Sequence, residues 1–319
     1  MLTLYGCQSK LPSVHVFVYD LSDPFIEGLS RMLESEGKKH FEMVIHDGFN
    51  SQIIQNELIV KSLEDSPDLI IVNPVDRLGA YTIIEKAKEK DIPVIFFNRE
   101  PLKRDLDLYD HAFYVGSDPR ESGIFQASMI STLFGGNPNN LNERDSNQDQ
   151  VIQMVIFKGE QGHQDAELRT DYVQSTLIDM GFEIEVTHVI VANWNEIEAY
   201  HKALELFEDN YSSIEVIVSN NDAMALGIIR AMHEYHEELL KQNDEHQPYS
   251  IPIFGVDGIP RAIEMIDMGE LNGTVINDAS NQSSAIINLA LAILSNDLDS
   301  LEYDLVDNHY IWIPYKKLN

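Results

Sequence analysis

The sequence alternates short apolar runs with amphipathic stretches along most of its length, and this alternation constrains the fold more than any other feature. Several runs, such as residues 69–74 and 92–97, have no polar face. Strands of this kind belong to parallel sheets that helices cover on both sides. The pattern predicts strands at residues 14–21, 41–45, 69–74, 92–97, 113–115, 151–157, 182–189, 214–219, 251–256 and 273–276.

Helical spacing of apolar residues predicts the intervening elements. They lie at residues 25–36, 51–63, 77–90, 120–133, 165–180, 194–206, 222–236, 261–268 and 281–294, with a polar loop at 242–247. These are too many strands for one open sheet, so we expect an α/β protein of two doubly wound, parallel-sheet domains. The polar break at residues 116–118 is one expected crossing between them.

Charge and hydropathy exclude several classes of partner. The 319 residues include 53 acids and 22 bases, which give a net charge of −31 at pH 7. Binding to polyanions requires clustered Lys and Arg, so we expect neither nucleic acid nor an anionic membrane surface as a partner. The longest apolar run, residues 285–294, is too short to span a bilayer.

The single cysteine, Cys7, follows Leu4, Tyr5 and Gly6. This order is similar to the lipobox of bacterial lipoproteins, in which the cysteine carries the lipid. No basic or apolar segment precedes it, as a signal sequence would require. Two interpretations therefore stay open: a signal whose upstream part lies outside this chain, which we prefer, or an incidental thiol. The first predicts that residues 1–13 are a lipidated tether on an extracytoplasmic protein.

A candidate ligand site follows the strand at 151–157. A Gly-containing turn leads into a helix that opens with His163, Asp165 and Arg169. A helix N-terminus offers unpaired N–H groups, and Asp165 and Arg169 lie one turn apart on the same face. Open α/β folds bind ligands at the carboxyl ends of their strands. Taken alone, however, Asp165 fits a helix cap and its pairing with Arg169 fits a surface ion pair.

Polar or aromatic residues also follow the other predicted strands. They are Asp23, Phe25, Asn98, Trp194, Asn221, Asp257 and Asn277. Carboxylates accept hydrogen bonds from sugar hydroxyls, amides and Arg donate to them, and aromatic rings pack on the C–H faces of a pyranose. Each residue could instead be a turn former or, for Trp194, part of the core. Their shared position predicts a sugar-binding site, and the chain has no Gly-rich loop for a phosphate.

A second constellation precedes the strand at 151–157. Oxygen-bearing side chains occupy positions one, three, five and nine of a loop, with the Val151 carbonyl at seven. This is the ligand spacing of an EF-hand calcium loop. The residues are Asp145, Asn147, Asp149 and Gln153. Gln150 stands at position six and Ile156 at position twelve, where the motif has Gly and Glu. A solvated acidic loop is the alternative interpretation.

Five segments resemble the periplasmic D-galactose/D-glucose-binding proteins, which are solute receptors of bacterial sugar ABC transporters. They read FFNREP (96–101), KGEQGHQDAELRT (158–170), NNDAMA (220–225), FGVD (254–257) and GTVIND (273–278), and the resemblance spans residues 14–315. It implies that a hexose is bound by Asp23, Asn98, His163, Asp165, Arg169, Asn221, Asp257 and Asn277, with its ring stacked between Phe25 and Trp194.

The resemblance also implies a structural Ca²⁺. The ion would be bound in the loop of Asp145, Asn147, Asp149, Val151 and Gln153, with Glu215 as a remote bidentate ligand. This supplies the carboxylate that the loop itself lacks. Residues 136–149 form a longer loop than the family has, so a register based on residues 140–142 stays open.

The implied fold has two lobes joined by a three-segment hinge, with the ligand cleft between them. One lobe comprises residues 14–116 and 277–311, and the other comprises 117–276 and 312–319. The implied function is that of a monomeric receptor that closes on D-galactose or D-glucose and delivers it to an ABC permease, without catalysis. Two alternatives stay open: signalling to a membrane sensor kinase or chemoreceptor, and, in a different class, a glycoside hydrolase that uses Asp23 with Asp165 or Asp257.

Overall fold

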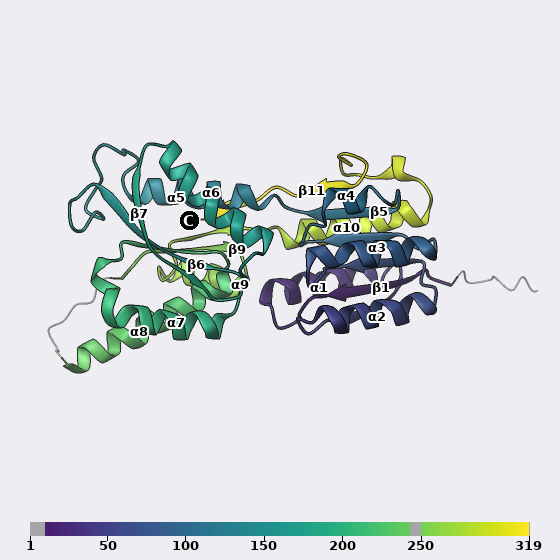
Figure 1. Ribbon diagram of the computed structural model, residues 1–319, viewed down its shortest axis with the longest axis horizontal. Coiled ribbons are helices and arrows are strands. Elements are labelled where there is room, and N and C mark those ends of the chain that lie inside the picture. The colour runs from purple at the N-terminus through teal and green to yellow at the C-terminus, as the bar shows by residue number, and fades with distance from the viewer. Residues whose placement is uncertain (1–9, 243–249, 319) are drawn as a thin grey trace, which may run out of the picture. The chain divides into compact units, whose positions relative to one another are not determined.

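The computed structural model describes residues 10–242 and 250–318, which form two compact units (Figure 1). The first unit contains the described residues up to Gly116 together with Ala279–Ile313. The second contains the described residues of Ser117–Asp278 and those from Pro314 onward. The chain therefore passes from one unit to the other three times. Cys7 and residues 243–247 of the predicted polar loop lie outside the described residues.

The first unit is built on a six-stranded parallel sheet of order β11-β5-β4-β3-β1-β2. Its strands are β1 (Ser13–Val18), β2 (Glu42–Asp47), β3 (Leu69–Val72), β4 (Val94–Phe97), β5 (Ala112–Gly116) and β11 (Tyr310–Trp312). Its helices are α1 (Pro24–Gly37), α2 (Gln52–Glu64), η1 (Arg77–Gly79), α3 (Ala80–Glu89), α4 (Lys103–Leu106), α10 (Ala279–Leu294) and η3 (Leu298–Ser300).

The second unit has a six-stranded sheet of order β12-β10-β9-β8-β6-β7, parallel except for β12, which pairs antiparallel with β10. Its strands are β6 (Val151–Lys158), β7 (Glu183–Val191), β8 (Val216–Ser219), β9 (Ile253–Asp257), β10 (Gly273–Ile276) and β12 (Lys316–Leu318). Its helices are α5 (Pro119–Leu133), α6 (Gln164–Asp179), α7 (Glu196–Asn210), η2 (Tyr211–Ser213), α8 (Asp222–Gln242) and α9 (Pro260–Asp267).

Strand order places helices on both faces of each sheet. In the first unit the chain moves from β1 to β2 and then back across β1 to β3, β4 and β5, so right-handed crossovers put α1 on one face and α2, α3 and α4 on the other. The contacts agree, because α1 packs on α10 while α2 packs on α3. The second unit repeats the plan: α5 packs on α6, and α7 packs on α8. Both units are therefore doubly wound, as predicted.

The cores lie between these layers. In the first unit, Phe17, Ile70 and Phe96 are completely buried under the helices, and in the second unit Met154 and Ile156 are buried in the same way. The wholly apolar strands β3 and β4 are buried at every residue, as their sequences predicted, and so is β8, which ends in Ser219. Each unit thus has a core of its own.

Several predicted boundaries were wrong. The crossing expected before Asn277 lies after Asp278, and the last crossing lies after Ile313 rather than after Ile311. Asn277 stays in the second unit because its backbone N–H bonds to the Asp257 carbonyl at 3.0 Å, and Asp278 pairs with Lys316 at 2.7 Å. The helix predicted from Trp194 begins at Glu196, after the cap Asn195. The helix predicted to end at residue 236 continues to Gln242.

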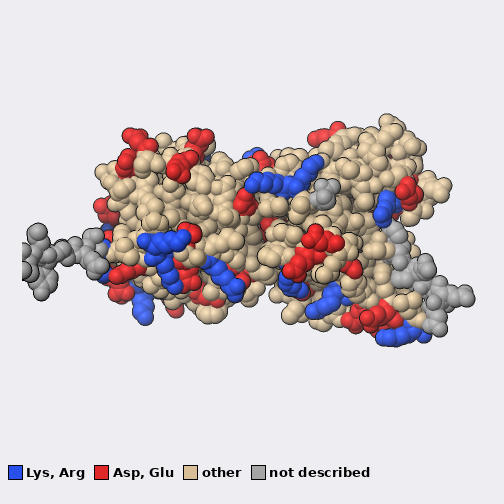
Figure 2. All heavy atoms as spheres, turned by 180° about the vertical axis from the view of Figure 1, so that it is seen from behind, with Lys and Arg blue, Asp and Glu red and all other residues tan. Residues whose placement is uncertain are grey.

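Three short elements, α4, β11 and β12, were not predicted, because three or four residues are too few to show a periodicity. Among the described residues, no helix is both long and apolar enough to cross a membrane. On the face shown in Figure 2, basic side chains occur among acidic ones rather than as a continuous basic surface.

Candidate functional site

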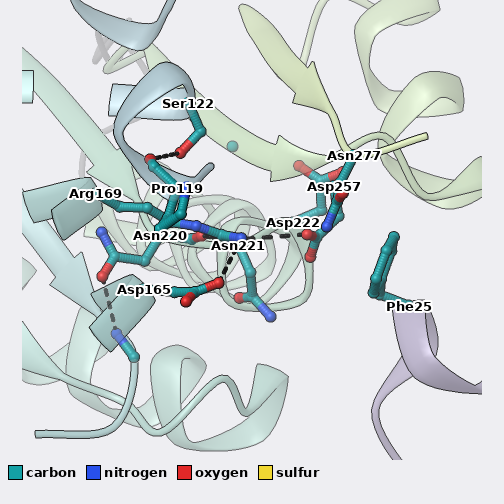
Figure 3. A network of polar contacts seen from close by, with 12 residues as sticks. Phe25, Pro119, Ser122, Asp165, Arg169, Asn220, Asn221, Asp222, Asp257 and Asn277 are labelled. Atoms are coloured by element: carbon teal, nitrogen blue, oxygen red, sulfur yellow. Dashed lines mark hydrogen bonds and ion pairs between the residues drawn. The ribbon is translucent and has the colours of Figure 1, made fainter. Parts of the chain in front are cut away.

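The carboxyl end of every parallel strand in the second sheet carries a residue that was predicted to bind ligand. Figure 3 shows Asp165, Asn221, Asp257 and Asn277 of this set. In sheet order they are Asn277 after β10, Asp257 at the end of β9, Asn221 after β8, His163 and Asp165 after β6, and Trp194 after β7. The strand order reverses between β8 and β6, which is the switch point where open α/β sheets bind ligands.

Arg169, on the second turn of α6, is the buried centre of this group. Its Nη1 donates to the carbonyl of Asn220 at 2.6 Å, and its Nη2 donates to the hydroxyl of Tyr315 at 3.1 Å. The carboxylates of Asp165 and Asp257 lie 3.6 and 3.8 Å from the guanidinium nitrogens. Burial opposes the charge, but Tyr315, Asp257 and Asp165 raise the pKa of Arg169 above its ordinary value. The site therefore holds a fixed cation between two carboxylates.

His163 and Trp194 form the aromatic part of the group. His163, rather than Asp165, caps α6, because its Nδ1 accepts the backbone N–H of Asp165 at 3.2 Å. The His163 ring meets Trp194 edge-on, with 5.3 Å between centroids, and the Arg169 guanidinium lies 5.6 Å from the indole centroid. Trp194 adopts a φ of +64°, and its indole lies against Gly159 so closely that a Cβ there would be 2.2 Å from Cζ2. This glycine makes room for the indole.

Asn221 and Asn277 are fixed by local hydrogen bonds. The Oδ1 of Asn221 accepts the backbone N–H of Met224 at 3.0 Å, and its Nδ2 donates to the carbonyl of Trp194 at 3.3 Å. The Oδ1 of Asn277 accepts the Ser117 hydroxyl at 3.1 Å. Both asparagines are buried, so their orientations are set by the fold.

Three buried donors of the group have no acceptor within the described part of the chain: Arg169 Nε, Trp194 Nε1 and Asn220 Nδ2. A buried donor without a partner costs about 1–3 kcal/mol, and native proteins usually satisfy it with a ligand or water. The group therefore has hydrogen-bonding capacity beyond its internal contacts.

The remaining predicted residues lie at strand ends of the first unit. Asp23 follows β1 and caps α1, with Oδ1 accepting the backbone N–H of Phe25 at 2.8 Å and Oδ2 accepting the Tyr19 hydroxyl at 2.5 Å. Phe25 is 7% exposed at the start of α1. Asn98 follows β4 with a φ of +60°. Its Oδ1 accepts from the Nδ2 of the buried Asn73, at 3.3 Å.

Sequence reasoning missed several supporting residues. In the first unit, Asn73 also accepts the backbone N–H of Tyr19 at 3.4 Å, and the Arg99 guanidinium lies 3.8 Å from the centroid of the Tyr19 ring. In the second unit, Tyr315 and the buried Asp222 were missed. Asn73 and Asp222 also follow apolar strands, so position alone could have found them, whereas Tyr315 comes from the last crossing and gives no such signal.

The predicted calcium loop is ordered by its own side chains. Asp145, which is 3% exposed, accepts the backbone N–H groups of Asp149 and Gln150 at 3.2 and 3.0 Å. Gln150 adopts a φ of +65°, the conformation that Gly supplies at position six of an EF-hand loop. The Oε1 of Gln153 is buried and makes no hydrogen bond within the described residues. The loop thus has a left-handed residue at position six, where the motif has its glycine.

The remote carboxylate of Glu215 lies at the same loop. It is 1% exposed and accepts the backbone N–H of Ser146 at 2.5 Å and that of Gln153 at 3.3 Å. Burial raises its pKa, and the charge of Asp145 adds to the increase. In the described part of the chain, however, no three acidic, His or Cys side chains converge as a metal site. Asp145, Asp149 and Glu215 instead accept hydrogen bonds from the loop.

Comparison with known proteins agrees with this architecture. Residues 14–298 match the family described as periplasmic binding protein domain. The D-galactose/methyl-galactoside binding periplasmic protein of Haemophilus influenzae is 36% identical over 307 residues, which cover 95% of this chain and 88% of that protein. The xylitol-binding protein of Mycolicibacterium smegmatis is 26% identical over 294 residues, 92% of this chain and 75% of its own length.

Solved structures share the fold. A periplasmic solute-binding protein of an ABC transporter from Actinobacillus succinogenes, with bound D-allose, has a TM-score of 0.78 at 19% identity and 97% coverage of both chains. One from Bacillus halodurans, with bound myo-inositol, has a TM-score of 0.77 at 24% identity, covering 98% of this chain and 96% of the other. The chain therefore belongs to the periplasmic binding protein domain family, whose members are extracytoplasmic receptors for solutes rather than enzymes.

Proposed function

We propose that this chain binds D-galactose or D-glucose through the strand-end residues of its two units and delivers the sugar to an ABC permease. The observation that carries the proposal is the buried Arg169, held between Asp165 and Asp257 in a sheet whose parallel strands all end in polar or aromatic side chains. The galactoside-binding relative supports a hexose as the ligand.

The chemistry of the group suits a neutral polyol. Each sugar hydroxyl can donate to a carboxylate while it accepts from an amide or from Arg. Asp165, Asp257 and Asp23 are the acceptors, and Asn98, Asn221 and Asn277 are the amides. His163 supplies a ring nitrogen, and Phe25 and Trp194 offer apolar faces for the sugar ring. Arg169 balances part of the acidic charge, so the site does not require a cationic ligand.

Binding and release require no covalent step. A sugar that binds one conformation of the receptor better than another shifts the population toward it, and a permease can recognise that conformation. Signalling to a sensor kinase or chemoreceptor is the second candidate, since the same conformation would serve either partner. Glycoside hydrolysis is disfavoured because Asp165 and Asp257, which it would need as acid or nucleophile, lie 3.6 and 3.8 Å from the buried Arg169 guanidinium and pair with it.

Calorimetric titration with glucose, galactose, ribose and arabinose tests the proposal. We expect hexose binding, and Asp165→Ala or Asn221→Ala should each weaken it at least about tenfold, because sugar hydroxyls would be buried without partners. Asp171→Ala, an exposed position on the same helix, is the matched control and should bind as the wild type does. Binding within about twofold of wild type in either variant would remove that residue from the site. Turnover of a glycoside would support the hydrolase instead.

We further propose that the loop of Asp145, Asn147, Asp149, Val151 and Gln153, with Glu215, binds a structural Ca²⁺. Three observations support this: the left-handed Gln150, the free Oε1 of Gln153 and the buried pair of Asp145 and Glu215. A cation would relieve the repulsion between those two carboxylates, and oxygen ligands are those that Ca²⁺ prefers. Binding requires Asp149 and Glu215 to exchange hydrogen bonds of the loop for the ion.

Thermal unfolding with calcium or a chelator tests this second proposal. A ligand that binds only the folded protein at 100 times its Kd adds about 2.7 kcal/mol of stability, so chelation should lower the melting temperature. Glu215→Gln should abolish the difference, whereas Glu183→Gln, an exposed control on β7, should keep it. If the loop that starts at Asp145 binds the ion, Asn147→Ala should reduce the effect of calcium on the melting temperature. If the register based on residues 140–142 is correct, Asn140→Ala should reduce it instead. An unchanged melting curve of the wild type on chelation would leave the loop a solvated acidic segment.

We also propose that the protein is held at the outer face of a membrane by a lipid on Cys7. The sequence around Cys7 supports this, although the residue lies outside the described part of the chain. Expression with a complete signal sequence and a radiolabelled fatty acid should label the wild type. Cys7→Ser should remove the label, and an unlabelled wild type would make the thiol incidental.

A further inference from the structure

Asp222 is the first residue of α8 and is completely buried. It is not one of the residues proposed to bind the sugar. Its Oδ2 accepts the backbone N–H groups of Gly258 and Ile259 at 2.7 and 3.0 Å. Its Oδ1 accepts the hydroxyl of Thr274 on β10 at 2.6 Å. The carboxylate therefore joins the start of α8 to the turn after β9 and to β10.

Gly255 leaves room for the Asp222 carboxylate. A Cβ built on Gly255, in the middle of β9, would lie 2.1 Å from Asp222 Oδ1. Any side chain at position 255 would displace the carboxylate. A glycine inside a strand often marks such a close approach of another group. The glycine and the buried acid thus form one arrangement.

The turn that Asp222 holds begins with a residue of the binding group. Asp257 adopts a φ of +123° and Gly258 a φ of +72°. A non-glycine residue in this region costs on the order of 1–3 kcal/mol and persists only where its surroundings hold it. The two N–H groups bound by Asp222 follow Asp257 directly, and the Asp257 carboxylate lies 3.8 Å from Arg169 (Figure 3).

We infer that Asp222 is a positioning residue for sugar binding: its ionised carboxylate holds the turn of residues 257–259 so that the Asp257 carboxylate faces the ligand. The inference rests on the proposed function and deepens it. Hydrogen bonds to an ionised acceptor are roughly twice as strong as those to a neutral one. Loss of the charge on Asp222 therefore loosens the turn without removing any group that touches the sugar.

The surroundings of Asp222 make its hydrogen bonds to the turn of residues 257–259 sensitive to pH. Burial raises the pKa of Asp222 to about 7, against the opposing effects of Thr274, the two backbone N–H groups and the Arg169 guanidinium. Arg169 reaches it from α6 and Asp257 belongs to the turn itself, while Asp165 and Tyr315 surround Arg169. Because protonation removes the charge, hexose affinity should fall as the pH decreases from 8 to 6.

Asp222→Asn separates the charge from the shape. Its oxygen can still accept both N–H groups, and its nitrogen can donate to Thr274, whose hydroxyl can rotate to accept. At pH 8 we expect this variant to bind hexose about threefold to tenfold more weakly than the wild type, with the two converging near pH 6. Asp222→Ala should bind at least about tenfold more weakly at both pH values. Asp105→Asn, a buried acid of α4 in the first unit, is the control and should follow the wild type.

Amide hydrogen exchange without sugar supplies the second readout. Gly258 and Ile259 should exchange faster in Asp222→Asn than in the wild type at pH 8, while amides in the strands of the first unit should not change. The inference is overturned if a folded Asp222→Ala binds hexose as the wild type does, or if the pH dependence of affinity survives in Asp222→Asn. A wild type that binds no hexose at any pH would instead overturn the proposed function, and the first titration would show it.

Discussion

At the scale of single residues, the Trp194 indole occupies space that is free only because residue 159 is a glycine. Gly159 follows β6, and its backbone N–H donates to the Oδ1 of Asn220 at 3.1 Å. A Cβ there would enter the indole of Trp194. Gly159→Ala must therefore push the indole from its place, at a cost of about 1–3 kcal/mol for an overpacked position, and should weaken hexose binding through Trp194.

Urea unfolding and tryptophan fluorescence measure both effects. Trp312 is the only other tryptophan, so the spectral change on adding hexose reports mainly on Trp194. Gly28→Ala is the matched control, since a Cβ there meets no atom within 4 Å and the residue lies in a helix, where Ala should stabilise slightly. If Gly159→Ala keeps both the stability and the hexose-induced spectrum of the wild type, Trp194 does not bind the sugar.

The residues that sequence reasoning could and could not predict differ in what marks them. His163, Asp165, Asn221 and Asp257 follow conspicuous apolar strands, and their position alone suggested a shared edge. Asp222 has the same position, but an acid at a helix start is ordinarily only a favourable charge for the helix dipole. Its importance comes from the N–H groups 36 and 37 residues further along the chain, and no local pattern encodes such a contact.

At the scale of elements, the edge of the first sheet contains a pair of histidines. His15 on β1 and His46 on β2 lie with 3.2 Å between Nδ1 and Nε2, and Ser62 of α2 lies 2.7 Å from His15 Nδ1. His46 also stacks on Phe17, with 4.7 Å between ring centroids. Burial lowers the pKa of both histidines. The charges nearby oppose each other, since Asp65 raises the pKa of His15 and Lys61 lowers that of His46.

This pair should make the first unit less stable in acid. In the unfolded chain the two histidines have a pKa of about 6.5, and in the folded unit burial lowers it. Their contribution to stability is therefore complete above about pH 6.5 and is lost as the pH falls below it. We expect the urea midpoint to decrease between pH 7.5 and pH 5, and His46→Gln should reduce that decrease. His40→Gln, an exposed histidine of the same unit, is the control. Equal decreases in all three proteins would contradict the assignment.

Length decided which elements the sequence could reveal. Strands such as β3 and β4 were predicted from short, continuous apolar runs, which are typical of parallel strands covered on both faces. The three-residue strands β11 and β12 form only by pairing with β5 and β10, which are distant in sequence. The loop proposed to bind calcium is an intermediate case: the spacing of its oxygen-bearing side chains was visible in the sequence, but only the structure shows that Gln150 adopts a φ of +65° where the motif has a glycine.

At the scale of the whole molecule, the chain forms two units, each with its own core, and passes between them three times. Each unit is therefore assembled from two segments that are separate in the sequence. The proposed binding residues are divided in the same way, with Asp23, Phe25 and Asn98 in the first unit and the others in the second. The proposed calcium ligands all belong to the second unit, and the histidine pair belongs to the first.

This division predicts the pattern of thermal unfolding. Proteins of more than one domain depart from two-state unfolding, and each unit here has a core of its own, so calorimetry of the sugar-free protein should resolve two transitions. Calcium should raise only the transition of the second unit, which is the transition that loses its calcium response in Glu215→Gln. Acidification from pH 7.5 to pH 5 should lower the other transition less in His46→Gln than in the wild type. A hexose that binds residues of both units should raise both transitions, because a ligand stabilises whatever must be folded to bind it. If saturating hexose raises only one transition, the sugar is bound by one unit alone, and the residues assigned to the other are excluded from the site.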